Sequence, residues 1–173
     1  ILKARPDLEI IDLRGNVGTR LSKLDDGQYD AIILASAGLK RLGLAERIRH
    51  TIQPAVSLPA VGQGALGLEC RSQDQAVLDL ILPLMHAETN MCVRAERAFN
   101  AYLEGGCQVP IAGYATLQNG QLQIEGRVGS VDGQTILKAV QYGAPEQAEM
   151  LGEELAKALL AQGAGELLKA LYQ

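Results

Sequence analysis

The sequence has no tryptophan, one phenylalanine and five tyrosines, so aromatic side chains that stack on nucleic-acid bases are scarce. Positive charge is not in excess either, because 16 Lys and Arg residues stand against 20 Asp and Glu, a net charge of −4. A chain of this charge does not attract nucleic acid over its whole surface, and we expect no nucleic-acid partner. A site for anions must come from a local cluster of basic side chains.

Cysteine and histidine are also few, and their placement argues against two further kinds of site. Three cysteines at irregular spacing do not make a disulfide framework and are typical of a reducing cytosol, so we expect a cytoplasmic protein. His50 and His86 lie far apart in the chain and indicate no metal site. The longest uncharged stretches, 55–68 and 105–124, are interrupted by Gly, Pro, Gln or Asn, so we expect no membrane helix and no membrane partner.

The 173 residues are 47% hydrophobic and 21% charged, the composition of a folded protein. In the first part of the chain, 8–13 and 30–35 have the pattern of strands, and apolar residues at helical spacing between them predict a helix over 17–24. Strand, helix and strand in this order predict a βαβ unit with a right-handed crossover, the mark of an α/β domain. Two short helices are expected after it, over 37–42 and 45–50.

A connection rich in Gly and Pro follows over 54–70. We expect it to end in a strand over 65–69 and to lead into a helix over 75–84 that Pro83 closes. Gln63 lies between two glycines of this connection, which allow either the close approach of a ligand or a hinge between domains.

The rest of the chain predicts a small α+β domain, in which a three-stranded antiparallel sheet stands between helices. The expected elements are a helix over 87–103, strands over 111–117, 121–128 and 135–142, and helices over 145–162 and 165–172. Asn119-Gly120 and Asp132-Gly133 separate the strands as hairpin turns.

Residues 12–20 place Gly and Asn where the first predicted strand passes to a helix. Free backbone N–H groups at a helix start attract anions, and the guanidinium groups of Arg14 and Arg20 bind carboxylate or phosphate in two-point fashion. Gly38 and Arg41 follow the second strand at the corresponding carboxyl end, where open α/β sheets bind ligands. The alternatives are a tight turn with solvated arginines and, for Arg41, a charge on a helix surface.

Cys107 follows Gly105 and Gly106 on a loop without bulky neighbours, whereas Cys70 lies at the end of a predicted strand and Cys92 lies within a predicted helix. It is therefore the cysteine placed as a nucleophile or attachment point, with nearby positive charge needed to favour its thiolate. The alternative is a small buried loop residue. No histidine lies near it in sequence to act as a base, which argues against a Cys-His hydrolase.

Four stretches carry these residues: Asp-Leu-Arg-Gly-Asn-Val-Gly-Thr-Arg (12–20), Ala-Gly-Leu-Lys-Arg-Leu (37–42), Leu-Pro-Ala-Val-Gly-Gln-Gly-Ala (58–65) and Leu-Glu-Gly-Gly-Cys-Gln-Val-Pro (103–110). In this order they resemble the porphobilinogen deaminases, also called hydroxymethylbilane synthases. The resemblance covers essentially the whole chain. Its last motif is the most specific, because in the family its cysteine carries a dipyrromethane cofactor through a thioether bond.

The resemblance implies a three-domain enzyme of which this chain is a C-terminal portion. Residues 1–58 resemble the later part of the second domain, an α/β domain like periplasmic binding proteins; 59–83 resemble the segment that returns to the first domain; and 84–173 resemble the C-terminal α+β domain with the cofactor cysteine. The family's catalytic aspartate, in a Lys-Asp-Val-Pro-like motif, has no counterpart in these residues. We therefore expect no catalytic residue in this chain, and we expect the chain alone to be inactive. Either the chain is a fragment, or the N-terminal segment is a separate chain or was removed by cleavage.

The resemblance also implies the reaction, in which four porphobilinogen molecules are condensed with release of ammonia to give hydroxymethylbilane for haem biosynthesis. Its partners would be porphobilinogen and oligopyrrole intermediates, and the family is usually monomeric. Cys107 would hold the dipyrromethane covalently, with Arg14 and Arg20 as further cofactor-binding residues, and Arg41, Gly38 and Gln63 would bind substrate.

Two interpretations from other classes stand beside this one. The chain could be a non-catalytic anion-binding module of periplasmic-binding type, whose ligand binding survives Cys107→Ser. It could also be a thiol redox protein using Cys107, which requires a low thiol pKa.

Overall fold

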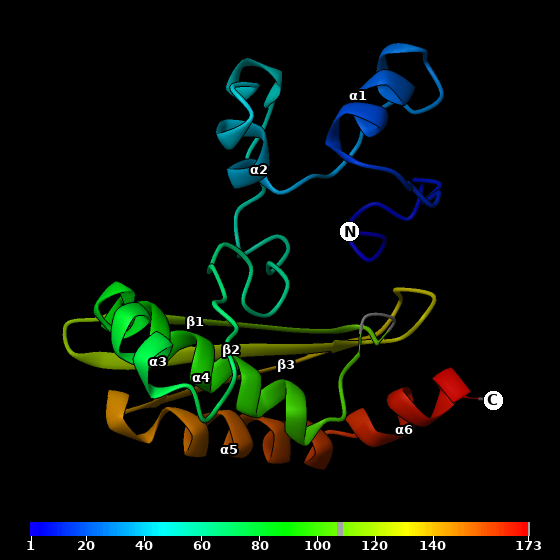
Figure 1. The fold of residues 1–173 in the computed structure, drawn as a ribbon. Coiled ribbons are helices and arrows are strands. Elements are labelled where there is room, and N and C mark those ends of the chain that lie inside the picture. Colours follow the sequence, from blue (N-terminus) through cyan, green and yellow to red (C-terminus); the bar gives the residue numbers. More distant parts are fainter. Residues whose placement is uncertain (107–108, 173) are drawn as a thin grey trace.

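The computed structural model describes residues 1–106 and 109–172 (Figure 1). Its C-terminal part is an antiparallel sheet in the order β1-β2-β3, with two long helices packed side by side against one face. The strands are β1 (Ile111–Gln118), β2 (Gln121–Gly129) and β3 (Ile136–Gly143), and the helices are α4 (Ala87–Tyr102) and α5 (Ala148–Ala161). The predicted α+β arrangement of this part is confirmed.

The core lies between the sheet and these two helices. Leu122 and Ile124 on β2 are fully buried, and Gln123 between them is less so, because alternate side chains of a strand point to opposite faces. Phe99 of α4 is also fully buried and lies over Gly113 and Gly126, which face each other across β1 and β2. The missing side chains of this glycine pair make room for the ring.

The turn between β1 and β2 is the one that its sequence predicts. Asn119 and Gly120 have φ angles of 52° and 76°, and Gln118 pairs with Gln121 directly beside them. Two residues with positive φ between paired strands form the tight hairpin whose twist matches that of the strands.

The remaining elements are short. They are α1 (Val17–Asp25), α2 (Ser36–Arg41), α3 (Gln75–Ile81) and α6 (Ala164–Lys169), and the 3-10 turns η1 (Ala45–Arg47), η2 (Leu82–Leu84), η3 (Pro145–Gln147) and η4 (Ala170–Tyr172). Figure 1 shows α1 and α2 on the side of the sheet away from α4 and α5. The helices expected in these regions are confirmed, except that the one over 45–50 is only a single 3-10 turn.

The strands expected over 8–13, 30–35 and 65–69 are wrong, since all three segments are irregular backbone. The βαβ unit expected from 8–13, 17–24 and 30–35 is therefore absent from the described residues. A strand is stable only beside a hydrogen-bonded neighbour that shares an apolar face with it. Ile10 and Ile33, which would have been core residues of such a sheet, are about 60% exposed (62% and 61%).

Among the described residues, no single helix is long and apolar enough to cross a membrane. One pair of helices in the same residues, Gln75–Leu84 and Ala87–Tyr102, has that length and composition when taken together, and the pair is bent by 107° at its junction.

Candidate functional site

The first predicted site residues lie around the N-terminus of α1. Asn16 caps this helix, because its side-chain oxygen accepts a hydrogen bond from the amide of Thr19 at 2.9 Å. Gly15 precedes it with a φ of 121°, a conformation that residues with a Cβ rarely adopt. The Gly-Asn pair thus ends the extended segment and starts the helix, as the sequence predicts.

Arg14 and Arg20 stand before and after this cap, and their environments differ. The Arg14 guanidinium is exposed and lies 3.8 Å from the Asp12 carboxylate, too far for a strong pair. Arg20 is half-buried, and its Nε atom is buried without a hydrogen-bond partner in the part of the chain that the structure describes. A buried donor without an acceptor is unusual in folded proteins and is suited to a ligand that supplies one.

The other predicted substrate residues lie on different elements. Gly38 and Arg41 belong to α2, where Arg41 is the last residue and is exposed. Gln63 is exposed in a turn over 60–65. Within the described ranges, no hydrogen bond or ion pair joins Arg41 to Arg14 or Arg20. Figure 1 shows α1 and α2 apart from each other, joined by an extended segment. The structure therefore brings Arg14 and Arg20 to one helix end but does not bring Arg41 into contact with them.

Cys107 lies outside the described residues, so its predicted role is not tested by the structure. The helix end that leads to it is well defined. The amide of Gly105 donates to the carbonyl of Asn100 at 2.9 Å and that of Glu104 donates to Ala101 at 3.1 Å, which together form a Schellman cap. Glu104 takes the left-handed conformation, with a φ of 53°, that this cap usually gives to glycine. The Asn100 side chain also donates to the Gly105 carbonyl at 3.1 Å, so the start of the cysteine loop is fastened to α4.

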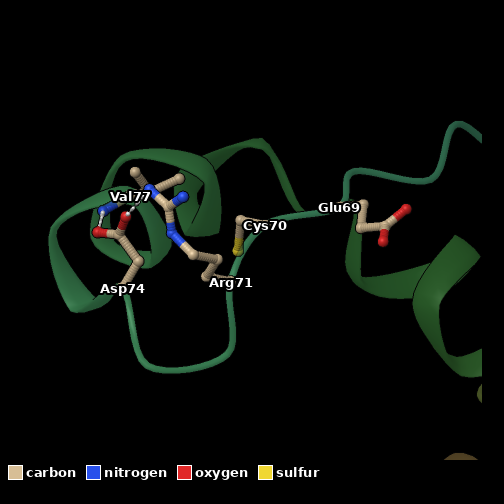
Figure 2. A pocket seen from close by; sticks show the side chains of 5 residues that line it. All are labelled: Glu69, Cys70, Arg71, Asp74 and Val77. Atoms are coloured by element: carbon tan, nitrogen blue, oxygen red, sulfur yellow. Dashed lines mark hydrogen bonds and ion pairs between the residues drawn. The ribbon is translucent and has the colours of Figure 1, made fainter.

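An open hollow of about 700 Å³ lies at the start of α3, lined by Glu69, Cys70, Arg71, Asp74 and Val77. Figure 2 shows Arg71 beside Asp74, with Glu69 pointing away from both. Asp74 is occupied as the cap of α3, accepting from the Val77 amide at 3.3 Å, and Arg71 lies 3.5 Å from its carboxylate. None of the predicted site residues lines this hollow.

Sequence reasoning did not single out Glu96, which is the buried charged side chain of the core region. Its exposed fraction is 5%, and its two carboxylate oxygens accept hydrogen bonds from the amides of Gly62 at 2.8 Å and Ala115 at 2.9 Å. Burial raises the pKa of Glu96, although the two amide hydrogen bonds act in the opposite direction. The sequence did contain a signal for this residue, because Glu96 is a charged residue on the face of the helix that carries the buried Phe99.

Arg127 on β2 was also missed. Its guanidinium donates to the carbonyls of Pro54 at 2.9 Å, Ala55 at 3.3 Å and Val56 at 3.4 Å, and to the Glu125 carboxylate at 2.7 Å. No signal in the sequence pairs residues more than 70 positions apart. No group of His, Cys, Asp and Glu side chains in the described ranges could hold a metal ion.

Two sequence models of one family match this chain. "Porphobilinogen deaminase, dipyromethane cofactor binding domain" matches residues 1–79, and "Porphobilinogen deaminase, C-terminal domain" matches residues 90–161. The first match contains Arg14, Arg20 and Arg41, and the second contains Glu96 and the loop of Cys107.

Proposed function

Since this chain belongs to the porphobilinogen deaminase family, a family of transferases in tetrapyrrole biosynthesis, we propose that it is part of a hydroxymethylbilane synthase. Such an enzyme condenses four porphobilinogen molecules head to tail, releases ammonia at each step and frees hydroxymethylbilane. The observation that carries the proposal is that the two family matches, over 1–79 and 90–161, together take in most of the chain.

We assign the binding of the pyrrole acid groups to Arg14 before α1, Arg20 in α1 and Arg41 in α2. Each porphobilinogen carries an acetate and a propionate, so a growing oligopyrrole accumulates negative charge. Arginine stays protonated at all relevant pH values and pairs with a carboxylate through two parallel hydrogen bonds. The buried, partnerless Nε of Arg20 supports this role, and Arg14 and Arg41 are exposed and accessible. Gly38 and Gln63 remain predicted substrate contacts.

The cofactor that the family implies is dipyrromethane, and the residues present fit its chemistry. Its acid side chains match the unpaired donor of Arg20 and the exposed guanidinium of Arg14 at the capped start of α1. Cys107 would hold it through a thioether. When bound, the dipyrromethane supplies the primer to which further pyrroles are added. The chain's own part is to hold the sulfur on a loop whose start is fixed by Asn100.

The catalytic aspartate of the family lies, in this proposal, on a segment outside these 173 residues. No Lys-Asp-Val-Pro-like motif occurs in the sequence. The isoleucines at 10, 11 and 33 are largely exposed, which suits a surface that further segments of the enzyme cover. We therefore propose that residues 1–58 are part of a periplasmic-binding-like α/β domain that those segments complete. We also propose that the assembled enzyme is a cytoplasmic monomer.

The proposal predicts where the cofactor is attached. We expect the intact mass of the chain, produced together with the family's N-terminal segment, to include a dipyrromethane that is lost in Cys107→Ser. Cys92→Ser is the matched control and should keep it, because Cys92 lies within α4, where burial and the charges of Glu96 and Glu88 raise the pKa of its thiol. The chain produced alone should show a free thiol and no turnover of porphobilinogen.

Two results would contradict this. Dipyrromethane retained in Cys107→Ser would disprove attachment at this sulfur, and bilane synthesis by the isolated chain would disprove the need for an aspartate elsewhere. Carboxylate binding without any turnover, unchanged in Cys107→Ser and in the presence of the N-terminal segment, would instead support an anion-binding module built on Asn16 and Arg20.

A further inference from the structure

The segment from Pro54 to Gly62, called the strap below, runs from one face of the sheet to the other around the edge strand β1. Its first residues contact Arg127, whose side chain lies on the face of β2 opposite to the buried Leu122 and Ile124. Its last residue contacts Glu96 on α4, which covers the other face. The strap has no strand or helix of its own, so its path depends on what holds it at these two ends.

The side chain of Arg127 holds the first end of the strap by hydrogen bonds to the strap's backbone. Residues 53–57 form a single helical turn, since the amides of Val56 and Ser57 both donate to the Gln53 carbonyl. The carbonyls at 54, 55 and 56 then have no partner in the turn, and the Arg127 guanidinium donates to all three. The guanidinium is itself oriented by Glu125, which also pairs with Lys138 on β3 at 3.0 Å. Arg127 and Glu125 have side chains only 15% and 17% exposed, so this is a largely desolvated contact.

Glu96 holds the second end. One carboxylate oxygen accepts from the amide of Gly62 and the other from the amide of Ala115 on β1. Because β1 is an edge strand, Ala115 donates to this carboxylate in place of a neighbouring strand. The Val61 methyl group also lies over Gly113, where an added Cβ would be 3.6 Å from it. The strap therefore covers part of the β1 edge, and one buried charge fastens both.

Gly62, the one glycine of the strap, is thus held by Glu96 and is not a flexible joint, although the glycine-rich sequence around it suggests a hinge. The chain on either side of the strap is held more loosely. Before it, residues 49–53 are exposed except for Ile52, which is half-buried. After it, Leu66 is 93% exposed and residues 67–69 are exposed as well. The same helix that carries Glu96 carries Asn100 one turn later, and Asn100 fixes the start of the cysteine loop. Strap and cysteine loop are consequently fastened to one helix.

We propose that Glu96 and Arg127 are positioning residues that make the strap part of the C-terminal domain, with the flexible joints at 49–53 and 66–69 on either side of it. Movement of the first part of the chain then leaves the strap and the cysteine loop in fixed relation. A role of this fixed relation in catalysis rests on the proposed function. The attachment of the strap by Glu96 and Arg127 does not depend on it.

Residue-resolved amide hydrogen exchange of the 173-residue chain tests the proposal without substrate or cofactor. In the unaltered chain, we expect the amide of Gly62 to exchange about tenfold or more slowly than amides at 49–53 and 66–69, after correction for intrinsic rates, because it donates to a buried charge. Equal protection of Gly62 and these joints would overturn the proposal, whatever the variants do.

Two variants separate the fastening points. Glu96→Gln keeps the volume but replaces one acceptor oxygen by a donor, and should speed exchange at Gly62 or Ala115 by about tenfold. Arg127→Met should speed exchange at Val56 and Ser57. In both, the amides of Leu122 and Ile124 in β2 should keep their protection, which distinguishes release of the strap from general unfolding.

Arg94→Met is the matched control, since it removes an exposed pair with Glu149 between α4 and α5 and should leave the strap unchanged. Unchanged exchange over 54–62 in folded Glu96→Gln and Arg127→Met would also overturn the proposal. Because no outcome depends on porphobilinogen or on Cys107, its failure is distinct from failure of the proposed function.

Discussion

Arg20 and Glu96 both have buried polar atoms, but these atoms differ in their partners. Glu96 accepts hydrogen bonds from two backbone amides. The Nε of Arg20 is buried and has no partner in the described part of the chain. Leaving a buried donor unpaired costs about 1–3 kcal/mol. Arg20 is therefore suited to a ligand with its own acceptors, and Glu96 to holding the chain together.

Replacing Arg20 by Met separates these two kinds of role. In the complete enzyme, we expect Arg20→Met to weaken binding of porphobilinogen by about ten- to a hundredfold, since a hydrogen bond to a charged group contributes about 1.5–3 kcal/mol. The free energy of unfolding of the chain should be unchanged or higher, because the unpaired donor is removed. Calorimetric titration and urea unfolding measure the two quantities.

Arg5→Met is the control for this variant. Arg5 is an exposed arginine paired with Asp7 at 2.6 Å and lies outside the four stretches 12–20, 37–42, 58–65 and 103–110, so its loss should change neither quantity. Undiminished binding by Arg20→Met would remove this residue from the proposed site.

The raised pKa of Glu96 predicts a particular dependence of stability on pH. At a pH between the ordinary pKa of 4.5 and the raised pKa, Glu96 keeps its proton in the folded chain and has released it in the unfolded chain. The contribution of Glu96 to the free energy of unfolding therefore falls as the pH rises through this window and is constant above it. Urea unfolding from about pH 4 to 8 should show this fall in the unaltered chain and its loss in Glu96→Gln.

Glu125→Gln gives the comparison with the opposite sign. Burial raises the pKa of Glu125, but its hydrogen bonds and charge interactions with Lys138 and Arg127 outweigh burial and lower it. The contribution of Glu125 to the free energy of unfolding is present above pH 4.5 and is lost as the pH falls towards the lowered pKa. If Glu96→Gln and the unaltered chain have the same pH profile, the assignment to Glu96 is wrong.

At the scale of elements, α4 and α5 approach closely because Gly152 of α5 has no side chain. A Cβ at this position would lie 2.8 Å from the backbone nitrogen of Phe99 and 3.0 Å from the Cβ of Ala98. Backbone atoms of a packed helix cannot yield without moving the helix. The same helix pair places Phe99 on the glycines of β1 and β2, so the spacing of α4 and α5 affects the whole core.

Gly152→Ala should consequently lower the free energy of unfolding by about 1–3 kcal/mol, the usual cost of overpacking. Gly165→Ala on α6 is the matched control, because an added Cβ would meet only Leu160 at 3.6 Å, an ordinary contact. That variant should be neutral or raise stability by up to about 1 kcal/mol, the difference between Gly and Ala in a helix. Chemical denaturation of both variants decides the matter, and equal stabilities would contradict the close packing.

At the scale of the whole molecule, the two parts of the chain differ in how completely they bury their apolar residues. The C-terminal part encloses a core that includes Phe99, Leu122, Ile124, Leu155 and Leu159 without exposure. In the N-terminal part, Leu21 and Leu39 are the buried apolar side chains among the described residues, and Ile10, Ile11 and Ile33 are largely exposed. The strap is the part of the first 60 or so residues that hydrogen bonds join to the C-terminal domain through Glu96 and Arg127.

Local signals in the sequence were enough for the elements whose partners are close in the chain. Asn16 capping α1, the Asn119-Gly120 turn and the alternating pattern of β2 act over a few residues, so the helices and the antiparallel strands were predicted with small errors at their ends. The four family stretches similarly identified the family, because those stretches are contiguous. The roles assigned to Cys107 and to the arginines remain predictions.

Contacts between distant residues were decided by the tertiary structure alone. The strands expected over 8–13 and 30–35 have suitable composition, but a strand forms only where a neighbour supplies hydrogen bonds, and the sequence of one segment does not specify that neighbour. For the same reason, nothing local indicated that Glu96 would bind Gly62 across 34 residues or that Arg127 would bind the carbonyls of 54–56. Propensity and capping act within a few residues of the chain, whereas burial and desolvation depend on which surfaces meet, and only the fold brings those surfaces together.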